Sequence, residues 1–217
     1  MKKEVLIFGI RDFAELAWYY FSNDSNYKVV AFVLTEEYMT ENKTFHDLPI
    51  VPFEDIEKFY PVDRYDFFVP MSPVKMNTVR ENIYNQVKQK GYKLASYVSS
   101  YAKVFSESIG DNCFILEGSV IQPFTIIGNN SIIWNAHIGH HSVIKNNVFV
   151  AKSILCGHVI VEDNCFIGAG ATIAENRVVK KGTFITMGSA LITDTTEWSV
   201  FAGNPAMLQK RKSTKMI

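Results

Sequence analysis

Four residues in the middle of the chain carry side chains that bind protons or ligands: Asn135, His137, His140 and His141. Three of the five histidines fall within five positions, 137–141, and His158 follows further on. A neutral imidazole accepts a proton near neutral pH, because its unperturbed pKa lies close to that range. The pattern therefore indicates a general base, or a place where imidazoles bind a ligand.

Three interpretations of this cluster are open. The imidazoles stack or hydrogen-bond within the fold and do no chemistry, or one of them is a general base. In the third interpretation, His137 binds a metal ion such as zinc together with His140 or His141. No carboxylate or thiolate stands at ligand spacing from these histidines, which makes the metal site the least favoured of the three.

The segment that holds the cluster repeats with a period of six. Such a period fits neither an α-helix nor an ordinary half-buried strand, but it fits short strands that turn a corner after each one. Small residues such as Gly110, Gly128, Gly139 and Gly168 follow the aliphatic position, as a tight corner requires. The repeat predicts a parallel β-helix whose aliphatic residues face inward. They are Ile109, Ile115, Ile121, Ile127, Ile133, Ile138, Ile144, Val150, Cys156, Val161, Ile167, Ile173, Val179, Ile185 and Leu191.

The first part of the chain has a different pattern, in which strands and helices alternate. Such alternation predicts a small parallel sheet covered on both faces, an α/β domain of the Rossmann-like kind. A boundary near Ser99 divides the chain into domains 1–99 and 100–217. The predicted strands are 5–8, 27–34, 65–69 and 94–98, and the predicted helices are 12–21, 52–60 and 76–90, the last capped by Gly91.

The turn after the first strand reads Gly9-Ile10-Arg11-Asp12. Ligands of parallel sheets lie beyond the carboxyl ends of the strands, near helix N-termini that favour phosphate. Gly9 permits close approach of the backbone, and Arg11 would pair with a phosphate. No G-x-G-x-x-G motif is present. The alternative is a tight turn in which Asp12 caps the helix, and both interpretations hold together.

Composition limits the possible functions. With 22 basic and 22 acidic residues, the formal net charge is zero, so nothing points to nucleic acid or an anionic membrane. No uncharged run is long enough to span a bilayer. We read the apolar start as a strand and not a signal peptide. The three cysteines, Cys113, Cys156 and Cys165, are expected to be buried free thiols, and we expect a cytoplasmic protein.

Three motifs, in this order after the α/β region, resemble one family. They are I-G-H-H-S-V-I at 138–144, C-F-I-G-A-G-A-T-I at 165–173 and A-G-N-P-A at 202–206. The chain resembles the NeuD/PglD-type sugar O-/N-acyltransferases over nearly its whole length. These bacterial enzymes move an acetyl group from acetyl-CoA to a sialic acid or a nucleotide-linked amino sugar. The resemblance implies a left-handed β-helix, although parallel crossovers are otherwise right-handed, and a homotrimer with active sites between subunits.

The resemblance also implies roles for single residues. His140 matches the general base, with His141 and Asn135 as further candidate catalytic residues, and the N–H near Gly157 would polarise the acetyl carbonyl. The candidate coenzyme A-binding residues are Gly157, Ala169, Met187, Gly188, Gly203 and Pro205. The candidate substrate-binding residues are Gly9, Arg11, Asp12 and Glu36.

The sequence departs from the family pattern at several of these positions. The residue after the base is usually Asp or Glu and here is His141, so the group that orients the imidazole is open, with Glu117 as a guess. A second family histidine is Phe149 here, and the acidic pair after the second strand is reduced to Glu36. These departures leave the identity of the sugar more open than the chemistry.

We therefore expect an acetyl-CoA-dependent N-acetyltransferase that acts on a nucleotide-linked amino sugar for surface polysaccharide, with acetyl-CoA as co-substrate and no metal. O-acetylation of a sugar such as sialic acid is the alternative among transferases. Two other classes stay open, a metal-binding β-helix protein of the hydratase kind and a non-catalytic protein that binds a sugar nucleotide.

Overall fold

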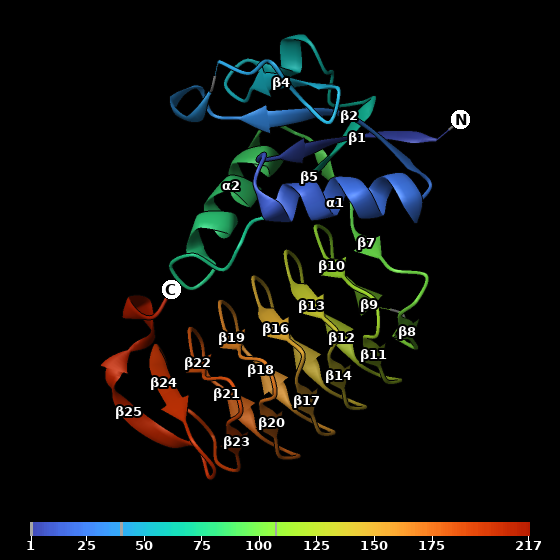
Figure 1. Ribbon diagram of the computed structural model, residues 1–217. Coiled ribbons are helices and arrows are strands. Elements are labelled where there is room, and N and C mark those ends of the chain that lie inside the picture. Colours follow the sequence, from blue (N-terminus) through green and yellow to red (C-terminus); the bar gives the residue numbers. More distant parts are fainter. Residues whose placement is uncertain (1, 40, 107) are drawn as a thin grey trace.

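The computed structural model describes residues 2–39, 41–106 and 108–217 (Figure 1). Its first part is one sheet in the order β3-β4-β2-β1-β5-β6, parallel except for the short β3–β4 pair. The elements are β1 Lys3–Phe8, α1 Asp12–Asn23, β2 Tyr27–Leu34, the 3-10 turn Glu36–Tyr38, β3 Thr44–Phe45, β4 Leu48–Pro52, the 3-10 turn Ile56–Lys58, β5 Tyr65–Phe68, α2 Thr78–Gln89 and β6 Lys93–Leu94.

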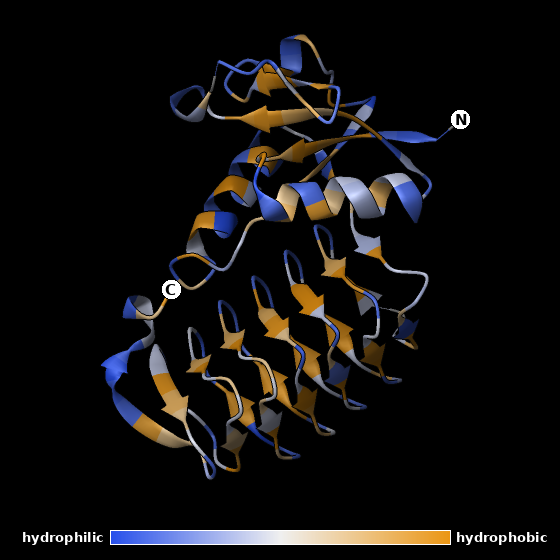
Figure 2. Ribbon diagram, in the orientation of Figure 1, coloured by the Kyte–Doolittle hydropathy of each residue, from blue (hydrophilic) through white to orange (hydrophobic). Residues whose placement is uncertain are grey.

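The two helices cover opposite faces of this sheet. Successive strand residues point to opposite faces, so Val5 and Ile7 pack with α1 while Leu6 and Phe8 pack with α2. The last four residues of β1 and of β2 are buried, and Figure 2 shows these ends of the two strands in the apolar colour. The strand order reverses between β1 and β5, and in sheets of this kind ligands bind outside the carboxyl ends of the strands at such a point. The Rossmann-like character of the region stays a prediction.

Two of the predicted elements need correction. The predicted helix 52–60 is only a 3-10 turn, preceded by the strand β4, because Pro49 and Pro52 favour extended backbone over a helix. The predicted strand 94–98 is split: β6 joins the first sheet, while β7 Tyr97–Val98 pairs with β10 Phe114–Ile115 of the next one. The division at residue 99 itself stays a prediction.

From β7 onward the chain forms three further sheets, each coil giving one strand to each sheet in turn (Figure 1). The first sheet holds β7, β10, β13 Ile132–Trp134, β16 Phe149–Ala151, β19 Phe166–Ile167, β22 Phe184–Ile185, β24 Ser199–Ala202 and the antiparallel β25 Met207–Lys212. The second holds β8 Lys103–Val104, β11 Val120–Ile121, β14 His137–Ile138, β17 Ile154–Leu155, β20 Thr172–Ile173 and β23 Ala190–Leu191. The third holds β9 Ser108–Ile109, β12 Ile126–Ile127, β15 Val143–Ile144, β18 Ile160–Val161 and β21 Val178–Val179, and a last 3-10 turn spans Ser213–Lys215.

The six-residue period follows from this arrangement, because each strand contributes one inward residue before the chain turns. From Ile115 to Leu191, every predicted inward residue except Cys156 is buried in one cluster. At that coil the inward residue is Leu155, which is fully buried, whereas Cys156 is half-buried at the corner that follows. The step from Val150 to Leu155 is therefore five residues long, and the next step, from Leu155 to Val161, is six. The left hand of the coil stays a prediction.

Two of the three cysteines behave as expected. Cys113 and Cys165 are free and buried, and burial raises the pKa of their thiols to about 11 and about 12. Both therefore remain protonated and act as small apolar residues in the core. None of the helices in the described part of the chain is long and apolar enough to cross a membrane.

Three edges join the three sheets, and each is named here by the residues in its turns. The glycine edge, between the first and second sheets, carries Glu117, Gly118, Asn135, Ala169, Gly170, Met187 and Gly188. The histidine edge, between the second and third, carries Gln122, Phe124, His140, His141, Gly157, His158 and Asn176. The asparagine edge, between the third and first, carries Asn112, Asn130, Asn147, Asn164 and Gly182.

The asparagine edge attaches the β-helix to α2. Asn112 donates to the side chain of Asn130, and Asn130 donates to that of Asn147, both at 2.7 Å. The fully buried Arg80 of α2 donates to the carbonyl of Asn130 at 3.1 Å and to that of Met71 at 3.0 Å. Burial lowers the pKa of Arg80 to about 9. A buried cation that donates to backbone carbonyl groups from both NH2 groups fixes α2 against the coils, since any shift would break these hydrogen bonds; its Nε has no hydrogen-bond partner in the described part of the chain.

The other helix, α1, lies between the sheet of the α/β region and the β-helix (Figure 1). The junction at its end includes Asp24, whose carboxylate accepts hydrogen bonds from the hydroxyl of Tyr97 at 2.6 Å and the N–H of Ser100 at 2.9 Å. Burial acts to raise the pKa of Asp24, but these hydrogen bonds outweigh it and the pKa lies below its ordinary value of 3.8.

This junction predicts a pH-dependent contribution to stability. Because the pKa of Asp24 is lowered by folding, its contribution is complete above about pH 4 and is lost as the pH falls through the folded-state value. We expect Asp24→Asn to lower Tm by several degrees at pH 7, for a loss of about 1–3 kcal/mol. Circular dichroism melts between pH 7 and pH 3 should show this difference shrinking below about pH 4. A difference in Tm that stays constant down to pH 3 would contradict the assignment.

Candidate active site

His140 lies in a turn of the histidine edge, between β14 and β15, with its side chain exposed. Its backbone N–H donates to the side-chain oxygen of Gln122, one coil earlier, at 2.9 Å. Its ring lies over Gly157, one coil later, so closely that a Cβ atom there would come within 2.6 Å of the ring. The turn therefore holds the imidazole between two neighbouring coils, and a side chain at position 157 would displace the ring.

The imidazole of His140 has a direct hydrogen-bond partner in the next residue. The Nδ1 atoms of His140 and His141 lie 3.1 Å apart, so one of them donates and the other accepts. When His140 donates from Nδ1, its Nε2 carries a free lone pair and is ready to accept a proton. His141 thus stands where an orienting group is needed, although as a neutral acceptor it stabilises the charged form of His140 less than a carboxylate would.

A column of rings supports His141. Its ring centroid lies 4.7 Å from that of Phe124 and 4.9 Å from that of His158, and the two imidazoles are nearly parallel at 13°. These residues and Asn176 occupy the same place on successive coils, and all four have a φ angle between 56° and 63°. The left-handed backbone makes the tight corner, and it directs this column of side chains outward.

Sequence reasoning named His158 but did not assign it to the site, and it missed Gln122 and Phe124. The signal was available in the spacing, because one coil spans 17 or 18 residues. Phe124, His141, His158 and Asn176 are 17, 17 and 18 residues apart, which is the period of the pairing between coils. His137, by contrast, is half-buried on β14 and is not part of the group of ring nitrogens that converge at this edge.

The remaining candidate coenzyme-binding residues lie on the glycine edge or at its end. The backbone N–H of Gly188 donates to the carbonyl of Ala169 at 2.9 Å, and Met187 beside it is 77% exposed. Gly203 follows β24, and its carbonyl accepts the N–H of Ala190 at 3.0 Å. Pro205 is exposed in the same turn. The structure thus brings Ala169, Met187, Gly188, Gly203 and Pro205 together along one edge.

Gly157, in contrast, lies with His140 on the histidine edge, and the second sheet separates the two groups within a chain. Asn135, expected near the histidines, also lies across that sheet, where its side chain packs over Gly118. A single chain therefore presents the imidazole and the proposed coenzyme groove on different edges of the β-helix.

Glu117 has a partner of its own and lies on the glycine edge as well. Its carboxylate accepts the hydroxyl proton of Tyr20 at 2.7 Å, and burial together with this contact raises the pKa of Tyr20 to about 12. Glu117, Tyr20 and Asn135 line a cavity of about 600 Å³ between α1 and the first coils. Within the chain, the carboxylate of Glu117 is thus engaged by Tyr20, and the group beside the ring of His140 is His141.

Phe149, at the position of the second family histidine, belongs to the packing between the two parts of the chain. It is 4% exposed, stacks on Phe166 at 5.3 Å and meets Phe13 of α1 at 6.1 Å. A polar ring at this position would lose these contacts and be buried without water. The replacement of the family histidine by Phe149 is therefore explained by the packing of α1 on the first sheet of the β-helix.

The candidate substrate residues gather at the carboxyl edge of the α/β sheet. Gly9, at the end of β1, has a φ of 97°, and its N–H donates to the carbonyl of Val33 in β2 at 2.8 Å. Arg11 is exposed and forms the N-cap of α1, so the helix begins with Asp12 in its first turn. The expectation that Asp12 caps the helix is wrong, because no side-chain bond caps this end. Glu36 is exposed after β2, the neighbouring strand, with its N–H held by the carboxylate of Glu54.

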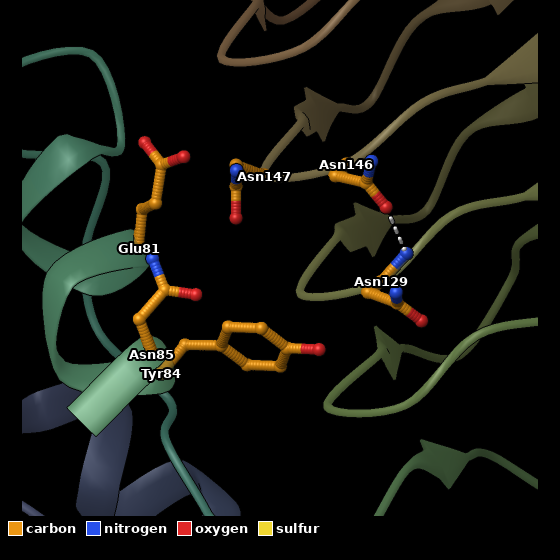
Figure 3. A pocket seen from close by; sticks show the side chains of 6 residues that line it. All are labelled: Glu81, Tyr84, Asn85, Asn129, Asn146 and Asn147. Atoms are coloured by element: carbon orange, nitrogen blue, oxygen red, sulfur yellow. Dashed lines mark hydrogen bonds between the residues drawn. The ribbon is translucent and has the colours of Figure 1, made fainter. Parts of the chain in front are cut away.

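A second cavity, of about 230 Å³, lies between α2 and the asparagine edge and is shown in Figure 3. It is lined by Glu81, Tyr84, Asn85, Asn129, Asn146 and Asn147. Its lining has no histidine, thiol or basic side chain. Because these amides lie beside the turns that Arg80 and Glu81 anchor, we assign the cavity to the joint between the two parts and not to the reaction.

These features define the class of the molecule: a β-helix of stacked hexapeptide repeats joined to a small α/β sheet. Two family models match within the β-helix. "Bacterial transferase hexapeptide (six repeats)" matches residues 108–140, and "Hexapeptide repeat of succinyl-transferase" matches residues 158–186. No curated protein matches the chain by sequence.

Solved structures share this architecture over almost the whole chain. The acetyltransferase domain of PglB from Neisseria gonorrhoeae is 19% identical, with a TM-score of 0.83 over 95% of this chain and 100% of that one. A mutant of perosamine N-acetyltransferase from Caulobacter crescentus, in complex with CoA and GDP-perosamine, is 18% identical, with a TM-score of 0.83 over 97% and 99%. WeeI from Acinetobacter baumannii is 18% identical, with a TM-score of 0.79 over 95% and 100%. In repeat and in fold, these matches confirm the resemblance seen in the sequence.

Proposed function

We propose that the protein is an acetyl-CoA-dependent N-acetyltransferase that acts on a nucleotide-linked amino sugar, with His140 as the general base. The observation that carries this proposal is the exposed imidazole of His140, held over Gly157 with its Nδ1 engaged by His141. The likeness in fold to acetyltransferases, one of them bound to CoA and GDP-perosamine, supports it.

In the reaction, the amine nitrogen of the sugar attacks the thioester carbonyl of acetyl-CoA. His140 Nε2 takes the proton that the nitrogen loses, and the bond to sulfur breaks as the tetrahedral intermediate collapses. The N–H of Gly157 is the donor that we assign to the carbonyl oxygen while it carries negative charge. The sulfur leaves as a thiolate and receives a proton, so the products are the N-acetylated sugar and free coenzyme A. No metal ion takes part in these steps.

A homotrimer would bring the histidine edge of one chain next to the glycine edge of another, which a single chain keeps apart. If the histidine edge of one chain lies beside the glycine edge of a neighbour, His140 faces a groove lined by Ala169, Met187 and Gly188 of the second chain. Exposed apolar residues on the outer faces of the second and third sheets are consistent with such contacts, Ile154 at 52% and Ile126 at 48%. In this arrangement Gly203 and Pro205 close the end of the groove, and the coil is left-handed.

The α/β region would hold the nucleotide at the carboxyl edge of its sheet. There the N-terminus of α1 and the exposed Arg11 would favour a diphosphate, and Glu36, exposed after the neighbouring strand, would accept hydrogen bonds from ribose hydroxyls. Gly9 leaves the backbone accessible between them, and Asp12 lies one residue beyond Arg11. The base and the sugar are not specified by these groups.

Turnover of purified protein tests the proposal. Acetyl-CoA is supplied with UDP-, dTDP- or GDP-linked amino sugars, and free thiol release is recorded. We expect release to depend on a sugar that carries a free amine and to be absent for the same sugar bearing a hydroxyl there. Release with the hydroxyl sugar or with free sialic acid would indicate O-acetylation instead. Nucleotide-sugar binding without affinity for coenzyme A would mean that the protein is not an acetyltransferase.

A further inference from the structure

We propose that His140, His141 and His158 form a binding site for a divalent transition-metal ion such as Zn²⁺, and that the bound ion blocks the general base. The three side chains are exposed, and one ring nitrogen from each lies within 4.8 Å of the others. The blocking effect rests on the proposed function of His140, whereas metal binding itself does not.

The β-helix brings these rings together from two coils. His140 and His141 are consecutive in one turn, and His158 lies one coil later in the column of His141. The ring of His140 stands at 87° to the other two, with its centroid 5.2 Å from each. The rings of His141 and His158 are parallel, 4.9 Å apart. Two nearly parallel rings and a third at right angles to both thus lie side by side at this edge, with one ring nitrogen of each within 4.8 Å of the others.

One of the distances within this group already suits a zinc ion. Zinc bonds to imidazole nitrogen at about 2.0–2.1 Å in a tetrahedral site, so two of its ligand atoms lie about 3.3 Å apart. The Nδ1 atoms of His140 and His141 already lie 3.1 Å apart. A rotation of the exposed ring of His158 completes the set, and the fourth position remains open to water. A set of three imidazoles selects zinc, copper or nickel over magnesium or calcium, which prefer oxygen ligands.

Metal binding and catalysis compete for the same ring. A metal ion takes the lone pair of a neutral imidazole nitrogen. When His140 gives the Nδ1 lone pair to the metal, its single proton sits on Nε2. The atom that would accept the proton of the amine then has no lone pair to offer. The site would therefore be inhibitory, and zinc would lower turnover without being required for it.

Zinc binding is measured directly on the 217-residue protein, freed of metal with a chelator, by calorimetry with ZnCl₂. We expect one zinc ion per chain in the wild type and a loss of affinity of about tenfold or more in His158→Asn. Asparagine suits this position, because Asn176 adopts the same backbone conformation one coil later. The matched control is His137→Gln, which removes a histidine of the same coil that lies outside the group and should bind zinc like the wild type.

Turnover gives the second readout, with each variant compared with its own metal-free rate. Zinc should lower the rate of the wild type and of His137→Gln, a chelator should restore it, and His158→Asn should need about tenfold more zinc. Failure of zinc to bind the wild type, or binding that survives His158→Asn unchanged, would overturn the site. If zinc binds as expected but no nucleotide sugar is acetylated, the site stands while the proposed function fails.

Discussion

Replacing His140 with alanine is expected to lower kcat by about 10²–10⁴-fold while the fold is retained. General-base catalysis contributes a factor of this size, and no other imidazole in the chain has its Nε2 in the same place over Gly157. The side chain is exposed at a turn, so its removal costs little folding free energy. The measurement is kcat and KM from thiol release, with Tm recorded in parallel.

His140→Asn is the matched variant, because it keeps a polar side chain at the turn but accepts no proton near neutral pH. Both variants should lose kcat together and leave the KM for acetyl-CoA within about twofold, since they remove a step of the chemistry and not a contact with the coenzyme. His137→Gln should keep its turnover, because that half-buried histidine lies outside the site. Turnover of His140→Ala close to that of the wild type would remove His140 from the mechanism.

The β-helix is predictable from the sequence because its physics is local and repeated. Each coil needs one inward aliphatic residue per face, and a residue such as Ile133 or Ile167 satisfies this requirement wherever it stands in the chain. Between Ile115 and Leu191, the predicted inward residue was wrong only at Cys156, where Leu155 faces inward instead. A thiol and the neighbouring Leu155 both suit a buried position, and the pattern alone could not tell which of the two faces inward.

The location of the site is less predictable than its residues. The sequence indicates His140 and His141 through their types, and Gly157 through its likeness to a family position. That Gly157 lies under the ring of His140 depends on the length of one coil, 17 residues at this point. Which residues share an edge depends on the order of three sheets. For that reason Asn135, five residues from His140, lies on the other side of the second sheet.

The structure also explains how a histidine, His141, can follow the proposed base in place of the usual Asp or Glu. A carboxylate is the usual partner in the family, and here a second imidazole takes its place at 3.1 Å. The sequence could not show this, because neighbours in a turn often point apart. The left-handed φ of 56° at His141 turns its ring toward that of His140 and onto Phe124. The same geometry leads to both the proposed mechanism and the proposed metal site.

Two neighbouring glycines allow activity and stability to be separated. A Cβ at Gly157 would lie 2.6 Å from Cε1 of His140, which is a movable side chain, whereas a Cβ at Gly139 would lie 2.5 Å from the carbonyl carbon of Cys156, which is backbone. We expect Gly157→Ala to displace the imidazole and lower kcat by about 10²-fold with little change in Tm, because a shift of about 1 Å at the base has this effect.

Gly139→Ala should act in the opposite way, by forcing two coils apart. Its N–H donates to the carbonyl of Leu155 at 2.8 Å, and a methyl group against the next coil strains that contact. We expect a loss of about 1–3 kcal/mol, seen as a fall in Tm, since overpacking of a rigid interior has this cost. Thermal melts and kcat measured on both variants separate the two effects. A Gly157→Ala protein with normal kcat would show that the ring of His140 need not lie over Gly157 for the reaction.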